Sequence, residues 1–287
     1  MAEETSIVVT GASTGIGRAC VAHAAAQGAR VFASVRKRHD ADALIADFGD
    51  AVAPLIFDVT EGTAVRAAAA QVGAMLGGRT LSGLVNNAGV AVAGPLLEMD
   101  SEELRSQFDV NFFGVHTVTQ AFAPLLGADP DREGPPGRIV MISSVAGQNG
   151  APFLGAYAAS KHAVEGYSQS LRRELMLFGI DVVVIGPGAI ATPIWDKADD
   201  IDVERYRNSP FFGALNAVRD YMLERGRDGL PPEDVGALVW HALTSENPKA
   251  RYAILRNALM DRTVPRLLPT RVVDRMIARR LGLAPKQ

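Results

Sequence analysis

The sequence has few of the features that mark secreted, membrane-spanning or nucleic-acid-binding proteins. Its 287 residues include one cysteine, Cys20, so no intramolecular disulfide can form, which favours a reducing compartment. The formal net charge is only −3 and the basic residues are dispersed, which argues against nucleic acid as the main partner. We expect Cys20 to pack as a small hydrophobic residue on an alanine-rich helix, in preference to acting as a reactive thiol.

Long apolar runs and metal-ligand patterns are also missing. No stretch reaches the ~18 uninterrupted apolar residues that a membrane-spanning helix needs. Residues 1–6 lead directly into an apolar strand, without the basic region, apolar core and small-residue cleavage site of a signal peptide. No two histidines have the spacing of metal ligands, so we expect no metal ion. Together these absences predict a cytoplasmic protein.

Short apolar segments bounded by glycine, asparagine or proline recur at intervals that suit crossover helices. Seven of them are predicted to be strands: Ser6–Thr10, Arg30–Val35, Val52–Phe57, Gly83–Val85, Arg138–Ile142, Asp181–Ile185 and Arg251–Leu255. The helix-like stretches between them include Gly15–Gln27, Thr63–Leu76, Ser101–Leu126 and Tyr157–Phe178. This alternation predicts the α/β class, with a seven-stranded parallel sheet covered by helices on both faces of a doubly wound, Rossmann-type domain. We assign this single domain to residues 1–260.

A charged and aromatic segment, from about residue 193 to residue 230, interrupts the alternation after the sixth strand. Its aromatic residues are Trp195, Tyr206, Phe211, Phe212 and Tyr221. In a parallel α/β sheet this position lies beside the ligand crevice at the carboxyl ends of the strands. We therefore predict a substrate lid, in preference to an ordinary surface loop.

Residues 261–287 form a C-terminal extension in which apolar and basic residues recur with helical spacing. The apolar stripe consists of Val264, Leu268, Val272, Met276 and Leu281, and the basic stripe consists of Arg271, Arg275 and Arg279. This pattern predicts an amphipathic helix. We expect it to pack against the domain or a second subunit, and peripheral contact with a membrane surface is the alternative.

The first predicted strand ends in a glycine-rich turn that leads directly into a helix. The turn holds Gly11, Gly15 and Gly17 in a GxxxGxG spacing. Glycines allow a tight turn and a close approach of the backbone to a pyrophosphate, and the free amides at the helix start face the anion. Because strand, turn and helix occur in the order that a dinucleotide site requires, we favour such a site over a purely structural turn.

The end of the second predicted strand bears on the choice between NAD and NADP. A NAD-specific site usually offers an acidic side chain there, to bind the ribose hydroxyls. Here the sequence reads Val35-Arg36-Lys37-Arg38. Arg36 is the best candidate to stack on the base and pair with a 2′-phosphate, so we predict NADP(H) as the cofactor, in preference to a solvated basic loop.

Tyr157 and Lys161 are four residues apart in a predicted helix and therefore share one face. A phenol with a pKa of about 10 transfers protons poorly at neutral pH, and a nearby ammonium group lowers that pKa. We therefore predict that Tyr157 is an acid/base group, although the YxxxK pattern alone is also common as a plain helix-face pair.

Several further motifs follow in a fixed order along the chain. They are Asn86-Asn87-Ala88-Gly89 after the fourth strand, Asn111 in a long helix, Ser144 thirteen residues before Tyr157, and Gly186 to Thr192 after the sixth strand. With these motifs the chain resembles the short-chain dehydrogenase/reductase family over nearly its whole length. Within that family it most resembles the 17β-hydroxysteroid and retinol dehydrogenase group, on the segments Phe32–Arg36 and Pro193–Lys197 and on its extended C-terminus.

The resemblance implies a role for each matching residue. Tyr157 would exchange a proton with the substrate oxygen, and Ser144 would orient that oxygen. Lys161 would hold the nicotinamide ribose and tune Tyr157, while Asn111 would anchor a water in the proton relay. Asp58 would contact the adenine. The residues expected to contact the cofactor are Gly11, Ser13, Thr14, Gly15, Ile16, Gly17, Arg36, Asp58, Asn87, Ala88, Gly89, Tyr157, Lys161, Pro187, Gly188, Ile190 and Thr192.

As a function, the resemblance implies an NADP(H)-dependent oxidoreductase that interconverts a carbonyl and an alcohol on an apolar substrate such as a steroid, a retinoid or a lipid. It also implies a homodimer or homotetramer built on the two long helices that hold Asn111 and Tyr157. Two alternatives remain because a fold alone does not determine function: a non-catalytic protein that senses NADP(H), and an epimerase or dehydratase on the same frame. The Tyr157–Lys161 pair favours the enzyme over the sensor.

Overall fold

The computed structural model describes residues 5–193, 203–256 and 268–283. Seven strands form one parallel sheet in the order β3-β2-β1-β4-β5-β6-β7. Their bounds are β1 (Ser6–Val9), β2 (Arg30–Val35), β3 (Val52–Ile56), β4 (Gly83–Asn86), β5 (Arg138–Ile142), β6 (Asp181–Pro187) and β7 (Arg251–Ile254). The strand order reverses between β1 and β4, and doubly wound sheets bind their ligands outside the carboxyl ends of the strands at such a point.

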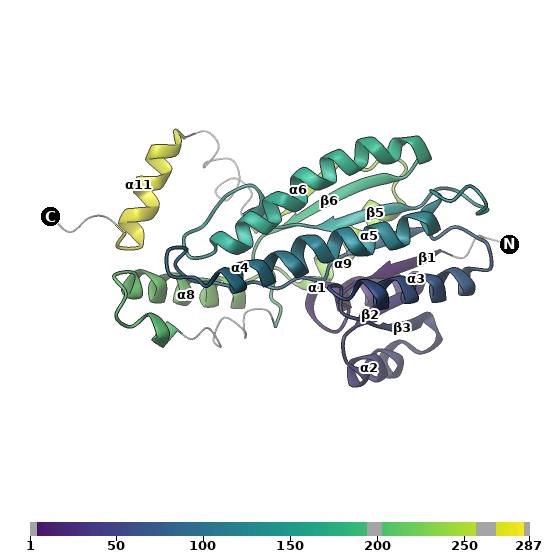
Figure 1. The fold of residues 1–287 in the computed structure, drawn as a ribbon, viewed down its shortest axis with the longest axis horizontal. Coiled ribbons are helices and arrows are strands. Elements are labelled where there is room, and N and C mark those ends of the chain that lie inside the picture. Colours follow the sequence, from purple (N-terminus) through teal and green to yellow (C-terminus); the bar gives the residue numbers. More distant parts are fainter. Residues whose placement is uncertain (1–4, 194–202, 257–267, 284–287) are drawn as a thin grey trace.

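Helices cover both faces of this sheet (Figure 1). One face carries α1 (Gly15–Ala26), α2 (Arg38–Phe48) and α9 (Pro232–Thr244), and the other carries α3 (Gly62–Leu76), α5 (Gly114–Phe122) and α6 (Gly155–Leu175). α4 (Ser101–Phe108) continues through a π-helical turn into α5. The predicted fold class is confirmed. None of the helices in these ranges is both long and apolar enough to span a membrane.

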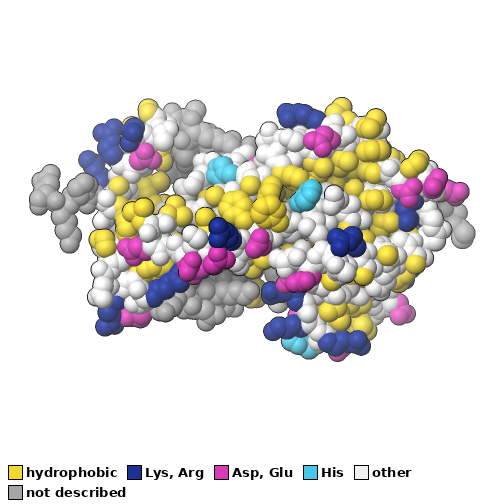
Figure 2. Space-filling view, viewed as in Figure 1, with side chains coloured by type: hydrophobic (Ala, Val, Ile, Leu, Met, Phe, Trp, Pro, Cys, Tyr) yellow, Lys and Arg dark blue, Asp and Glu magenta, His cyan; other side chains and the backbone are white. Residues whose placement is uncertain are grey.

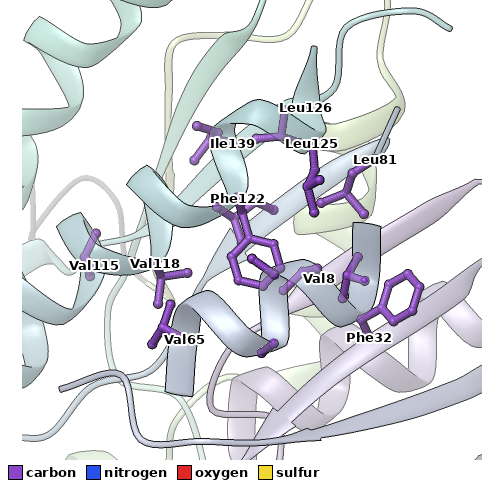
Figure 3. Close-up of a cluster of buried hydrophobic side chains, with 14 of the residues drawn as sticks. Val8, Phe32, Val65, Leu81, Val115, Val118, Phe122, Leu125, Leu126 and Ile139 are labelled. Atoms are coloured by element: carbon purple, nitrogen blue, oxygen red, sulfur yellow. The ribbon is translucent and has the colours of Figure 1, made fainter. Parts of the chain in front are cut away.

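Each face of the sheet has its own apolar core, because strands of a parallel sheet are buried on both sides. Val8 points into one core, while its neighbours Ile7 and Val9 point into the other. Figure 3 shows the first core, in which Phe122 of α5 lies among side chains from the sheet and from α3. Cys20 lies in the second core with 2% of its surface exposed, and burial raises the pKa of its thiol to about 12. It is the buried hydrophobic residue that the sequence predicts.

The segment predicted to be a substrate lid and the C-terminal helix lie together at one end of the molecule (Figure 1). The lid contains a 3-10 turn and α8 (Phe212–Arg227), and the C-terminal helix is α11 (Thr270–Arg280). Leu281, which follows α11, packs against a third apolar cluster that includes Leu215 and Val218 of α8. Trp195, Val264 and the expected domain boundary near residue 260 lie outside the described residues.

Replacing Phe122 by alanine tests the first core. Its ring is fully buried, so Phe122→Ala leaves a cavity, and we expect the free energy of unfolding to fall by about 3–5 kcal/mol. Urea unfolding measures this value. Met176→Ala is the control, because that side chain is 74% exposed, and it should change stability by less than ~0.5 kcal/mol. Equal unfolding midpoints for the two variants would contradict this description of the core.

Candidate active site

The glycine-rich turn between β1 and α1 is braced by the segment that follows β4. Gly11 has a φ of 65°, and a Cβ at Gly17 would overlap the Gly11 carbonyl oxygen, so both positions require glycine. Asn87 Nδ2 donates to the carbonyl oxygens of Thr10 at 2.9 Å and Gly11 at 3.0 Å. The Thr10 hydroxyl accepts hydrogen bonds from the backbone amides of Asn87 and Ala88. Asn87, predicted to line the cofactor, thus also holds the shape of the turn.

The start of α1 fits a pyrophosphate group. Thr14 is the N-cap residue, and its side chain makes no capping hydrogen bond within the described structure. The first amides of the helix therefore remain available to an anion. A Cβ at Gly15 would lie 3.1 Å from Thr192, so the loop after β6 closes over the same helix start. A helix N-terminus without side-chain bulk, covered by a second loop, suits the phosphates of a dinucleotide.

Arg36 and Asp58 meet at the carboxyl edge of the sheet, where they follow the neighbouring strands β2 and β3. An Arg36 guanidinium nitrogen lies 4.0 Å from an Asp58 carboxylate oxygen. The same carboxylate accepts hydrogen bonds from the Thr60 amide at 3.0 Å and the Thr60 hydroxyl at 2.8 Å. Asp58 is thus held in place, while 62% of the Arg36 side chain is exposed and accessible to a phosphate.

Ser144 and Tyr157 come together at the carboxyl ends of β5 and β6. Ser144 follows β5, and its hydroxyl donates to the Pro187 carbonyl oxygen at 3.5 Å. Tyr157 lies in the first turn of α6 and shares a side-chain hydrogen bond with Ser144. Burial raises the pKa of the Tyr157 phenol, and the hydrogen bond to Ser144 opposes that rise. The sequence predicts a lowered pKa from the nearby ammonium group, but in this structure burial dominates and keeps the phenol protonated at neutral pH.

Lys161 lies one helical turn beyond Tyr157, with its Nζ 5.9 Å from the centre of the Tyr157 ring. Nζ donates a hydrogen bond to the Ile142 carbonyl oxygen at 2.9 Å. Only 5% of the residue is exposed, and burial lowers the pKa of the ammonium group from 10.5 to about 8, while the Glu165 carboxylate opposes this shift. Lys161 is therefore charged at neutral pH and directed toward the phenol that it is predicted to tune.

Asn111 is fully buried in the π-helical turn Asp109–Phe113 between α4 and α5. Its Oδ1 accepts from the Val90 amide at 2.9 Å, and its Nδ2 donates to the Val90 carbonyl oxygen and the Ser160 hydroxyl. A Cβ at Gly89 would lie 3.2 Å from Asn111 Oδ1 and 3.7 Å from Lys161 Nζ, so the two side chains face each other across this glycine. The π-helical turn, a feature frequent at functional sites, brings Asn111 to Lys161.

Glu165 and Arg251, which the sequence analysis does not single out, support α6 from the side of β7. The Arg251 guanidinium forms a bidentate pair with the Glu165 carboxylate at 3.0–3.1 Å, and both side chains are largely buried. A Cβ at Gly186 would overlap the guanidinium, so glycine there lets Arg251 reach across β6. The i,i+4 spacing from Lys161 could have indicated Glu165. No local pattern indicates Arg251, because its partner is 86 residues away.

Comparisons with known protein families, sequences and structures all find short-chain dehydrogenases or reductases. A family model described as short chain dehydrogenase matches residues 5–202. An NADPH-dependent 3-dehydrocapnine reductase from Ornithobacterium rhinotracheale is 40% identical over 94% of both chains. A 3-ketodihydrosphingosine reductase from Bacteroides thetaiotaomicron is 33% identical over 85% of this chain and 86% of its own length. Human 17-beta-hydroxysteroid dehydrogenase type 6 is 30% identical over 96% of this chain and 89% of its own length. The structure of a short chain dehydrogenase/reductase from Burkholderia phymatum in complex with NAD is 27% identical, covers 95% of both chains and has a TM-score of 0.77.

The buried ammonium group of Lys161 predicts a pH-dependent difference in stability between the wild type and Lys161→Met. The folded-state pKa of about 8 lies below the unfolded value of 10.5, so the unfolded chain binds more protons between these two values. Burial of the charged ammonium group therefore lowers the free energy of unfolding below pH 8, and this penalty disappears above pH 10.5. We expect the unfolding free energy of the wild type, relative to Lys161→Met, to rise through this window in urea unfolding of the cofactor-free protein. Lys249→Met, at an exposed position, should show no such trend, and a flat difference for Lys161→Met would refute the expectation.

Proposed function

The chain belongs to the short-chain dehydrogenase family, and on that basis we propose that it is an NADP(H)-dependent oxidoreductase that interconverts a carbonyl group and an alcohol on an apolar, lipid-like substrate. The observation that carries the proposal is the joining of Ser144, Tyr157 and Lys161 at the carboxyl ends of β5 and β6. The likeness to reductases named for 3-dehydrocapnine and 3-ketodihydrosphingosine, and to a hydroxysteroid dehydrogenase, supports an apolar ketone as the substrate.

The geometry supports a division of roles in carbonyl reduction. When bound, the nicotinamide cofactor supplies the hydride. Tyr157 donates its phenolic proton to the substrate oxygen, because burial keeps that proton in place until the transfer. Ser144 hydrogen-bonds to the same oxygen and orients it, since its hydroxyl already reaches Tyr157. The Lys161 ammonium group stabilises the phenolate that remains, and Asn111 positions the groups around it.

The preference for NADP(H) rests on Arg36. Its guanidinium lies exposed just beyond β2, at the position where a NAD-specific site usually places an acidic residue. A planar guanidinium pairs well with a phosphate group. One relative is named as NADPH-dependent and one solved relative contains NAD. Membership of the family therefore does not distinguish the two cofactors, and the assignment depends on Arg36.

Self-association through the two long helices that hold Asn111 (α4–α5) and Tyr157 (α6) is part of the proposal. Figure 2 shows hydrophobic side chains gathered over α4 and α5. Among the exposed apolar residues there, Phe113 is 54% exposed and Leu104 is 38% exposed, and Leu97 before α4 is 86% exposed. Such a patch is more stable when a second copy of the chain covers it, which supports a homodimer or homotetramer.

Tyr157→Phe tests the proposed chemistry directly. The variant retains the ring but lacks the proton, so we expect kcat to fall by about 100-fold or more. NADPH consumption with a panel of steroids, retinoids and long-chain ketones, including 3-ketodihydrosphingosine, measures this loss. Tyr167→Phe, on the same helix and bonded to His116, is the control and should keep the wild-type rate. A Tyr157→Phe variant with full activity would refute the mechanism, and NADPH binding without turnover of any compound would favour a sensor.

Arg36→Ala tests the cofactor preference. Loss of the guanidinium should raise the KM for NADPH by about tenfold or more and leave the KM for NADH nearly unchanged, since a hydrogen bond to a charged group contributes about 1.5–3 kcal/mol. Steady-state kinetics with both cofactors gives the two values. Arg105→Ala removes an equally exposed charge from α4 and should alter neither. Unchanged NADPH kinetics in Arg36→Ala would contradict the assignment.

A further inference from the structure

Glu165 and Arg251 form a buried charge pair between α6 and β7. Glu165 is 7% exposed, and the side chain of Arg251 is 17% exposed. The guanidinium donates three hydrogen bonds of 3.0–3.1 Å to the two carboxylate oxygens. A buried pair of this kind often stabilises a fold no better than packed apolar side chains of similar volume would. Its presence therefore calls for a reason other than stability.

Two glycines let this pair approach the backbone around Ser144. A Cβ at Gly186 would overlap the Arg251 guanidinium and would lie 3.3 Å from the Ser144 carbonyl oxygen. A Cβ at Gly147 would lie 3.1 Å from Glu165 Cγ, so the turn that follows Ser144 packs directly on this side chain. The guanidinium and the carboxylate thus lie behind the loop that carries the proposed orienting hydroxyl group.

Glu165 is also the anion that acts on the Lys161 ammonium group. Lys161 Nζ donates to the Ile142 carbonyl oxygen, so the carboxylate one helical turn away acts on it through space. Burial lowers the pKa of Lys161, and the Glu165 carboxylate opposes that fall. Within the described residues, the groups that face this ammonium from α6, β7, the π-helical turn and the loop after β5 are Tyr157, Glu165, Arg251, Asn111 and Ser144. The neighbouring His162 is exposed, and its ring bonds to the Ala158 carbonyl oxygen.

The guanidinium determines how strongly the carboxylate acts. A bare carboxylate one helical turn away would attract the ammonium group and form a direct ion pair with it. A bidentate guanidinium occupies the carboxylate and offsets part of its field. Resting on the proposed oxidoreductase function, we propose that Glu165 and Arg251 are positioning residues for the reaction: the carboxylate keeps the Lys161 ammonium group charged, and the guanidinium leaves it free to face the phenol.

Lysine NMR tests this proposal without any turnover. In the full-length, cofactor-free protein labelled with carbon-13 in its lysine side chains, the Lys161 signal is the one of five that Lys161→Met lacks. Its titration midpoint should lie near pH 8 in the wild type. Glu165→Gln removes the anion but keeps the shape of the side chain, and it should lower the midpoint by about one pH unit. Arg251→Gln lets the carboxylate act on the ammonium group at full strength, and it should raise the midpoint.

The opposite directions separate an electrostatic role from a merely structural one. If the pair only fastened α6 to β7, both amides would loosen the site, admit water and move the midpoint the same way, toward pH 10.5. Glu174→Gln and Arg173→Gln make the same two changes at the exposed end of α6, and they should move the midpoint by less than ~0.2 pH unit. Midpoints that move together, or controls that move as far, would overturn the proposal.

Two further variants keep the test decisive if a single amide variant does not fold. The double variant Glu165→Gln/Arg251→Gln carries two amides that can still hydrogen-bond, and its midpoint should lie below that of the wild type and above that of Glu165→Gln. Glu165→Asp keeps the charge, and its midpoint should stay within about 0.3 pH unit of the wild type. A double variant and a Glu165→Asp variant that titrate alike would overturn the proposal.

The pH profile of kcat tests the role in the reaction. With NADPH and the ketone of the panel above that the wild type reduces fastest, the alkaline limb of kcat should follow the NMR midpoints, while the KM for the ketone stays within about twofold. Alkaline limbs that coincide with that of the wild type would overturn the assigned role even if the midpoints move. If no compound is reduced, the oxidoreductase proposal fails, and the NMR midpoints still decide whether Glu165 and Arg251 control the charge of Lys161.

Discussion

A buried ammonium group organises the candidate active site. Lys161 Nζ is held by the Ile142 carbonyl oxygen beneath the Tyr157 ring, and a buried cation at neutral pH needs a compensating charge nearby. Glu165 supplies that charge one helical turn away. Burying the Glu165 carboxylate without a partner would itself cost free energy. Arg251 neutralises it by reaching across β6. This run of alternating charges ties the helix that carries Tyr157 and Lys161 to the edge of the sheet.

The parallel sheet explains why residues from distant parts of the chain meet at one edge. Every strand ends on the same side, so the glycine turn, Asn87, Ser144 and Pro187 all emerge together. Contacts at this edge are close because glycines occupy the crossing points: Gly17 beneath the turn and Gly186 beneath Arg251. Two separate apolar cores, one on each face, pack the helices against the sheet and hold the segments that carry these contacts in place.

The end of the molecule that holds α8 and α11, where the sequence predicts a lid, is built differently from the end that holds the glycine turn. No residue of α11 is fully buried, and α8 and α11 contact each other through a small apolar cluster and the stacking of Arg280 on Tyr221. Few buried contacts mean a low free energy of local opening, which suits elements that admit a substrate. The other end, with its fully buried Asn111 and braced glycine turn, is the rigid counterpart.

Local patterns in the sequence were enough to determine the seven strands, most of the helices, the glycine turn and the shared face of Tyr157 and Lys161. These features depend on residues a few positions apart, so periodicity and spacing reveal them. Only the tertiary structure decided which charges pair and which groups are buried. It raised the pKa of Tyr157 through desolvation, placed Asn111 and Lys161 on either side of Gly89, and paired Glu165 with Arg251. Burial and long-range contacts depend on the whole packed chain, and no short stretch of sequence contains that information.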